Sequence, residues 1–213
     1  MPTITFIGDV HGHIDKYLKL IEDVDFSVQL GDMGFDYSKL YNIDTNHHRF
    51  VPGNHDNYPV INTWLRESRS FPVNGLFRLG GVEMYAFRGG LSIDRYIRVE
   101  GIDWFADEEM SHWNLRMAID EIVENKPKII VSHVCPVLLQ QELVCRGLGD
   151  IVKYAPTVIT ARTEQAMQTA FDLISVKPDY WIFGHHHVWF DETIEGTRFV
   201  CVPELCRFQL FIP

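Results

Sequence analysis

The chain has 213 residues, of which 46% are hydrophobic and 23% charged, and its formal net charge is −10. This apolar content can fill one substantial core, and no Pro/Ser-rich linker or repeat divides the chain, so we expect a single domain over residues 1–213. The acidic balance argues against broad nucleic-acid binding, which needs a basic surface to displace counterions from phosphates. No apolar run approaches the length of a membrane span, and the four cysteines form no Cys-x-x-Cys pair, so we expect a soluble cytoplasmic protein.

Short runs rich in β-branched and aromatic residues predict the strands of a largely buried sheet. In chain order these runs span residues 3–7, 26–30, 50–51, 82–87, 129–131 and 180–183. Helical periodicity predicts helices over residues 13–23, 113–124 and 163–174. Towards the end of the chain, an antiparallel meander is predicted for residues 188–194, 198–202 and 208–212. Alternating units followed by hairpins favour two mixed sheets with helices outside.

A short polar cluster directly follows most of the predicted strands. The clusters are Gly8-Asp9-Val10-His11-Gly12, Gly31-Asp32, Gly53-Asn54-His55-Asp56, Ser132-His133 and Gly184-His185-His186-His187. In open α/β sheets, functional side chains gather at the carboxyl ends of the strands, so we expect these clusters to converge. The glycines let the backbone turn tightly there and approach a ligand closely.

The clusters carry the ligand types of a site for two metal ions. Asp and His suit divalent Mn, Fe or Zn, and a carboxylate neutralises part of their charge. Two ions about 3.5–4 Å apart need an anion that touches both, and together they turn a shared water into a hydroxide nucleophile. Asp32, on a short turn after a glycine, fits the bridging position. Taken singly, each cluster has another interpretation: Asp9 as a helix cap, His133 as a structural residue, Gly31-Asp32 as an ordinary turn.

The series of clusters resembles the calcineurin-like metallophosphoesterase superfamily, in particular its small prokaryotic and phage-type members. The family pattern runs Asp-x-His, Gly-Asp, Gly-Asn-His-Asp/Glu, His and Gly-His-x-His, and here it extends from Asp9 to His187. The resemblance implies an α/β fold, a four-layer α/β/β/α sandwich of two mixed sheets flanked by helices. It also implies two metal-ligand sets, one of Asp9, His11, Asp32 and His187 and the other of Asp32, Asn54, His133 and His185. His186 occupies the variable position of its motif and is expected to point away from the metals.

The same resemblance implies the reaction. A metal-bridging hydroxide would attack a phosphate mono- or diester in line, without a covalent phosphoenzyme. His55 would not bind metal but would protonate the leaving oxygen or stabilise the transition state, and Asp56 would orient its imidazole. The expected cofactors are two divalent metal ions, Mn first, with Fe, Zn, Ni or Co as alternatives.

Two arginines of the related serine/threonine protein phosphatases are missing from this chain. In those enzymes the second motif continues as Asp-Arg-Gly and an Arg precedes Gly-Asn-His, whereas this chain has Asp32-Met33-Gly34 and Pro52-Gly53-Asn54. A protein substrate is therefore not supported.

A replacement is predicted in residues 87–98, where paired glycines and three arginines follow a strand. Because arginine grips phosphate bidentately, we expect substrate contacts from Arg88, Arg95 and Arg98. The alternative is a surface loop whose arginines pair with the surplus acid of the chain.

Two classes of function stay open at this point. A metal-dependent phosphatase or phosphodiesterase, acting on an unidentified phosphoester, is favoured because every motif ligand is present. The competing class is a binding or scaffold protein that keeps the fold without turnover, and a weaker third is a mononuclear metalloenzyme. Neither the substrate nor the oligomeric state follows from these residues.

Overall fold

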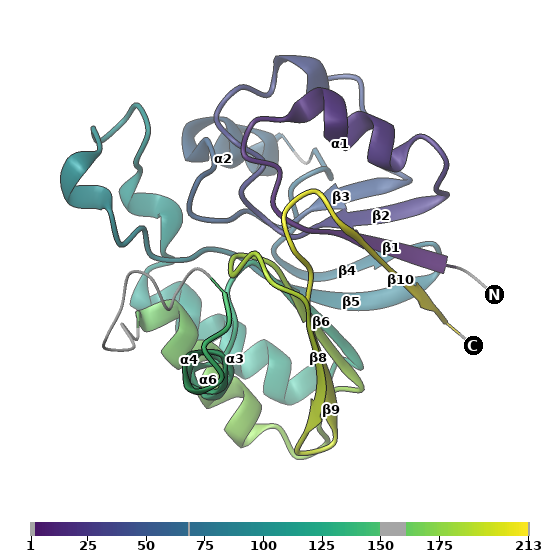
Figure 1. Cartoon of the computed structure of the whole chain (residues 1–213), viewed down its shortest axis with the longest axis vertical. Coiled ribbons are helices and arrows are strands. Elements are labelled where there is room, and N and C mark those ends of the chain that lie inside the picture. The colour runs from purple at the N-terminus through teal and green to yellow at the C-terminus, as the bar shows by residue number, and fades with distance from the viewer. Residues whose placement is uncertain (1–2, 68, 150–160, 213) are drawn as a thin grey trace.

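Two β-sheets stacked face to face, with helices on both outer sides, make up the computed structural model, which describes residues 3–67, 69–149 and 161–212 (Figure 1). The described strands are β1 (Thr3–Ile7), β2 (Phe26–Gln29), β3 (His48–Phe50), β4 (Gly75–Leu79), β5 (Val82–Phe87), β6 (Ile129–Ser132), β7 (Tyr180–Phe183), β8 (Phe190–Ile194), β9 (Thr197–Cys201) and β10 (Arg207–Phe211). The described α-helices are α1 (Ile14–Ile21), α2 (Tyr58–Arg66), α3 (His112–Asn125), α4 (Val137–Cys145) and α6 (Arg162–Leu173). Short 3-10 turns are η1 (Ser38–Leu40), η2 (Arg95–Ile97) and η3 (Ala106–Glu108). None of the described helices is long and apolar enough to cross a membrane.

Both sheets are mixed. Within the described residues, a four-stranded sheet has the order β10-β1-β2-β3 and a six-stranded sheet has the order β4-β5-β6-β7-β9-β8. The central strands of each run parallel, and the antiparallel strands β10, β4 and β8 lie at the edges. The parallel strands of a sheet have their carboxyl ends on the same side, so the segments that follow β1, β2, β6 and β7 can meet there.

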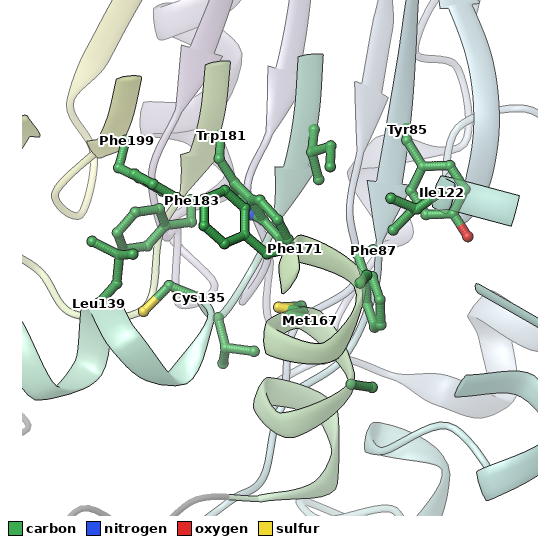
Figure 2. Close-up of a cluster of buried hydrophobic side chains, with 14 of the residues drawn as sticks. Tyr85, Phe87, Ile122, Cys135, Leu139, Met167, Phe171, Trp181, Phe183 and Phe199 are labelled. Carbon is green, nitrogen blue, oxygen red and sulfur yellow. The ribbon is translucent and has the colours of Figure 1, made fainter. Parts of the chain in front are cut away.

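Three apolar layers hold these elements together. Between the sheets, Phe6 and Val28 of the smaller sheet belong to one buried cluster with Val131 and Ile182 of the larger. The outer face of the smaller sheet packs against α1 and α2, and the outer face of the larger packs against α3, α4 and α6. Figure 2 shows Phe171 of α6 against the larger sheet, where its ring centroid lies 6.1 Å from that of Trp181 and 5.5 Å from that of Phe199. The predicted α/β/β/α sandwich is confirmed.

The predicted meander at the C-terminal end is wrong in its last strand. β8 and β9 form a hairpin closed at Glu195 and Gly196, whose φ angles of 50° and 86° are those of a tight left-handed turn. β10 instead crosses to the other sheet and pairs antiparallel with β1, from Thr3↔Phe211 to Ile7↔Arg207. This pairing covers the edge of β1 and buries Leu210 between the sheets, a gain that local alternation cannot reveal.

Three elements were not predicted from the sequence. α2 starts beside the Asn57 cap, whose side chain accepts a hydrogen bond from Val60 N at 3.3 Å, and it follows directly on a ligand cluster. α4 is apolar on most of its surface, so it has little helical periodicity. β4 pairs antiparallel with β5, and its alternation is short.

The placement of β10 predicts a contrast between neighbouring residues. Leu210 is 5% exposed and packs between the sheets, while Phe211 is 70% exposed. We expect Leu210→Ala to lower the free energy of unfolding by about 2–4 kcal/mol, because it leaves a cavity in a close-packed layer. Phe211→Ala is expected to change it by less than about 0.5 kcal/mol. Urea unfolding of both variants measures the difference, and equal losses would contradict the pairing of β10 with β1.

Candidate metal centre

The ligand-type residues lie on turns directly after the strands. β1 leads into Asp9 and His11, β2 into Asp32, β3 into Asn54, β6 into His133, and β7 into His185 and His187. Four of them have a left-handed backbone, with φ at 47° for His11, 54° for Asp32, 66° for His185 and 52° for His187. Residues that carry a Cβ rarely adopt this conformation, and it persists where the surrounding contacts enforce it, as at functional sites.

Two glycines allow these turns to approach one another. A Cβ on Gly184 would lie 2.4 Å from Asp9 Oδ1, and one on Gly53 would lie 2.4 Å from Asp32 Oδ1. Non-bonded atoms do not approach so closely, so a side chain at either position would displace a carboxylate. These glycines thus have the close-approach role that the sequence indicates.

A first group of ligand atoms is formed by Asp9, His11 and His187. His187 Nε2 lies 3.0 Å from Asp9 Oδ2 and 3.1 Å from His11 Nε2, and the atoms of the group all lie within 4.8 Å of one another. Asp32 Oδ2 is 4.0 Å from His11 Nε2, at the edge of this group. The imidazole nitrogens and carboxylate oxygens therefore face a common point.

A second group surrounds His133 Nε2. Asp32 Oδ1 and His185 Nδ1 each lie 3.1 Å from that nitrogen, and Asn54 Oδ1 lies 3.0 Å from it. The other ring nitrogen, Nδ1, donates to Leu30 O at 2.8 Å, which leaves the lone pair of a neutral imidazole on Nε2. Asp32 thus directs one oxygen to each of the two groups.

The second group is short of protons. Its two side-chain oxygens only accept hydrogen bonds, and a single proton on His133 Nε2 cannot serve both oxygens and His185 Nδ1 together. Burial acts to lower the pKa of His133, but the Asp32 carboxylate outweighs it and raises that pKa to about 10. Burial acts to raise the pKa of Asp32, yet the neighbouring imidazoles, His133 first, hold it well below its usual range. A buried group of carboxylate, amide and imidazole lone pairs with too few protons to share fits a divalent cation.

His55 and Arg98 face each other beside the first group. The ring centroids of His55 and His11 are 5.6 Å apart, and Arg98 Nη2 lies 3.5 Å from His55 Nε2. Arg98 donates to both oxygens of Asp94 at 2.8 Å and to Asp103 O at 3.1 Å, so its guanidinium is held in place. Burial lowers the pKa of His55; the Asp32 carboxylate opposes this change and Arg98 adds to it.

The other two predicted arginines are not brought to this place. Arg88 lies over the ring of Tyr58, with Cζ 5.5 Å from the centroid, and Arg95 is exposed in η2. Within the described part of the chain, no contact joins either of them to a ligand-type residue. Of the three, Arg98 is the one that the structure brings beside His55.

We expected Asp56 to orient the imidazole of His55, but its carboxylate accepts hydrogen bonds from other groups. Its Oδ1 accepts hydrogen bonds from Gly34 N at 3.1 Å and Tyr37 OH at 2.8 Å, and its Oδ2 accepts from Asp32 N at 3.0 Å and Gly53 N at 2.7 Å. These four bonds use both oxygens of a fully buried carboxylate. Asp56 therefore ties together the two turns that carry Asp32 and Asn54, which is a structural task.

His186 is turned away from both ligand groups. It is 1% exposed, and its Nε2 lies 3.3 Å from Cys135 Sγ. Its neighbours on either side present their rings to the two groups, and the buried contact with Cys135 holds the turn between them. Cys135 itself is fully buried and belongs to the apolar layer on the outer face of the larger sheet.

Two further polar residues beside Asn54 were missed. Asn54 Nδ2 donates to Ser92 Oγ at 3.2 Å, and Ser92 Oγ in turn donates to Glu108 Oε2 at 2.7 Å. Ser92 and Glu108 lie far from Asn54 in the chain and belong to none of the clusters. No spacing in the sequence could have found them.

Asp56→Asn is expected to lower the free energy of unfolding by about 2–4 kcal/mol, because the new NH2 group would face backbone N–H donors in a buried place. Thermal or urea unfolding of the metal-free protein measures this loss. The matched control is Asp36→Asn, an exposed carboxylate that accepts from Ser38 N at 2.9 Å, where little change is expected. Equal stabilities of the two variants would contradict the structural role of Asp56.

Cation binding is expected to release a proton. At pH 7 a His133 imidazole with a pKa of about 10 is protonated, and a metal ligand needs the Nε2 lone pair, so binding displaces that proton and affinity rises with pH. Titration calorimetry with Mn²⁺ in buffers of different ionisation enthalpy counts the protons released. A binding enthalpy that is independent of the buffer would show that no proton is displaced.

A family model and several solved structures are similar to this chain. The model of the calcineurin-like phosphoesterase family matches residues 2–189. Among solved structures, the chain is similar to phosphopantetheinyl hydrolase from Mycobacterium tuberculosis, with 15% identity and a TM-score of 0.49 over 96% of this chain and 90% of the other. It is also similar to a Staphylococcus aureus protein with a proposed 5′-nucleotidase assignment, with 15% identity and a TM-score of 0.50 over 99% of this chain and 51% of the other.

At these identities the likeness to solved structures concerns the fold alone. No curated protein matches the chain. The family match covers most of the chain and includes every ligand-type residue described above. The protein belongs to the calcineurin-like phosphoesterase family, as its sequence motifs indicate.

Proposed function

We propose that the protein is a phosphoesterase that depends on two divalent metal ions. The observation that supports this most is the position of the Asp32 carboxylate, with Oδ1 3.1 Å from His133 Nε2 and Oδ2 4.0 Å from His11 Nε2. The ligands proposed for one cation are Asp9, His11, Asp32 and His187, and those for the other are Asp32, Asn54, His133 and His185. Mn²⁺ is the proposed ion, because carboxylate, imidazole and amide oxygen donors suit it.

When bound, the cations supply Lewis acidity and lower the pKa of a water that attacks phosphorus in line. His55, which faces the first group from the side, donates a proton to the leaving oxygen or stabilises the charge that develops there. Burial lowers the pKa of His55, so less of it is protonated at pH 7, while the protonated form gives up its proton more readily.

Arg98 is the proposed contact for the phosphoryl oxygens. Its guanidinium lies 3.5 Å from His55 Nε2, beside the group proposed to act on the leaving oxygen. Asp94 accepts from Nε and Nη2 and Asp103 O accepts from Nη1, which holds the guanidinium in place and leaves one N–H on each Nη for phosphate. Because the side chain is already fixed, little side-chain entropy is lost when phosphate binds. Arg98 thus takes the place of the arginines that are missing after Asp32 and before Gly53.

The proposed substrate is a phosphate monoester or diester. Broad binding of nucleic acid is not proposed, because the net charge of the chain is −10. We also propose that the chain works as one domain in the cytoplasm. All four cysteines are free, which is the usual state in a reducing compartment.

The test is hydrolysis of para-nitrophenyl phosphate, its bis-ester and cyclic nucleotides by protein loaded with Mn²⁺. We expect turnover, and we expect His55→Ala to keep two metal equivalents while the rate falls by about 10²–10⁴-fold, because a proton donor is lost and no ligand is. Metal content is measured by elemental analysis of the same samples.

The matched control is His112→Ala, an exposed histidine at the start of α3, which should keep both metals and the rate. No turnover of any substrate by protein that holds two metals would favour the scaffold alternative. Loss of metal in His55→Ala would overturn the assignment of His55.

A further inference from the structure

A buried polar pair supports Asn54 from a segment that carries none of the ligands. Ser92 and Glu108 are each 2% exposed and lie in the connection between β5 and α3, the teal segment that extends from the body at the left of Figure 1. Ser92 N donates to Glu108 Oε1 at 2.7 Å and Ser92 Oγ donates to Glu108 Oε2 at 2.7 Å. Both oxygens of the carboxylate are therefore occupied by one serine.

The direction of these hydrogen bonds determines which end of the Asn54 amide faces the second ligand group. Burial raises the pKa of Glu108, and the hydrogen bonds from Ser92 oppose that rise. In its ionised form Glu108 has no proton to give, so the hydroxyl proton of Ser92 points to it. Towards Asn54 the hydroxyl can then only accept, and it accepts from Nδ2 at 3.2 Å. The amide oxygen must point the opposite way, and Oδ1 does lie 3.0 Å from His133 Nε2.

We propose that Glu108 and Ser92 are positioning residues that hold the Asn54 oxygen toward the second cation. The inference rests on the proposed function, because it concerns a ligand of that cation. An amide that is free to turn could present NH2 in place of its oxygen, and NH2 is not a ligand. Groups that orient a ligand in this way typically raise metal affinity by about 10–100-fold.

The backbone around the pair is also held. Gly90 N donates to Glu108 O at 3.1 Å, and the single hydroxyl proton of Tyr58 is shared between Gly53 O at 2.9 Å and Glu108 O at 3.3 Å. Gly90 passes so close that a Cβ on it would lie 2.8 Å from Val134 Cγ1 and 3.3 Å from Asn54 Oδ1. The segment that bears Arg98 is thus joined at its root to the second ligand group.

Glu108→Gln tests the direction of the hydrogen bonds that run from Asn54 through Ser92 to Glu108. The substitution keeps the shape of the side chain. Because Ser92 N already donates to Oε1, the new glutamine side chain keeps its oxygen there and turns its NH2 to the Ser92 hydroxyl. The hydroxyl proton then points to Asn54, which favours the flipped amide. We expect the affinity for the second Mn²⁺ to fall by about 10–100-fold, while the affinity for the first is unchanged.

Asn54→Asp completes a double-mutant cycle. A carboxylate offers an oxygen on both sides. When Asn54→Asp is combined with Glu108→Gln, one oxygen of the new carboxylate accepts the Ser92 hydroxyl proton and the other binds the second cation. With the native Glu108 it would instead meet a hydroxyl whose proton is already engaged. We expect Glu108→Gln to weaken the second Mn²⁺ site when residue 54 is Asn, and to leave it unchanged or strengthen it when residue 54 is Asp.

The readouts are the second dissociation constant from calorimetry and the electron paramagnetic resonance spectrum of a coupled Mn pair, neither of which needs turnover. The matched control is Glu109→Gln, the same change one residue along, where the carboxylate meets Arg162 and Thr163 instead of Ser92. It should leave both affinities unchanged. If Glu108→Gln does not fold, Ser92→Ala replaces it and is expected to weaken the same site.

The outcomes separate this inference from the proposed function. A native protein that binds fewer than two Mn²⁺ ions would refute the two-metal function itself. Native protein with two bound ions, and an equal effect of Glu108→Gln in both backgrounds of residue 54, would leave the function standing and overturn the positioning role.

Discussion

The buried carboxylate of Asp32 is the group on which the arrangement of the site depends. Both of its oxygens are used: Oδ1 accepts from His55 N at 2.7 Å and meets His133, while Oδ2 faces His11. A lone anion at 1% exposure is costly unless a positive charge or hydrogen-bond donors compensate it. Here the compensation comes from the His133 imidazole, whose pKa the carboxylate raises to about 10, and from the backbone N–H of His55.

The two sheets contribute the parts of this site together. Asp9, His11, Asp32 and Asn54 follow strands of the smaller sheet, and His133, His185 and His187 follow strands of the larger. The apolar layer between the sheets fixes their separation, so it also fixes the distance between the two halves of the ligand set. Asp56, which at first reads as part of the chemistry, instead ties two turns of the smaller sheet to each other.

The connection between β5 and α3 contributes an arginine and a buried polar pair, which the ligand-bearing turns do not carry. It brings Arg98 to His55 and sets Ser92 and Glu108 behind Asn54, so one segment reaches both the proposed substrate side and the second ligand group. In this chain, one segment carries both Arg98 and the pair that contacts Asn54. Substrate binding and metal binding are therefore expected to respond together to changes at the root of the segment.

The sequence by itself determined the family, the strands that carry the clusters and the residue types that meet, because each ligand sits in a short motif after an apolar run. It could not reveal that β10 pairs with β1, since alternation shows which face is buried but not which sheet buries it. Nor could it identify the task of Asp56 or the contact from Ser92 and Glu108 to Asn54. Those depend on hydrogen-bond directions between segments far apart in the chain, and only the packing of the two sheets brings the segments together.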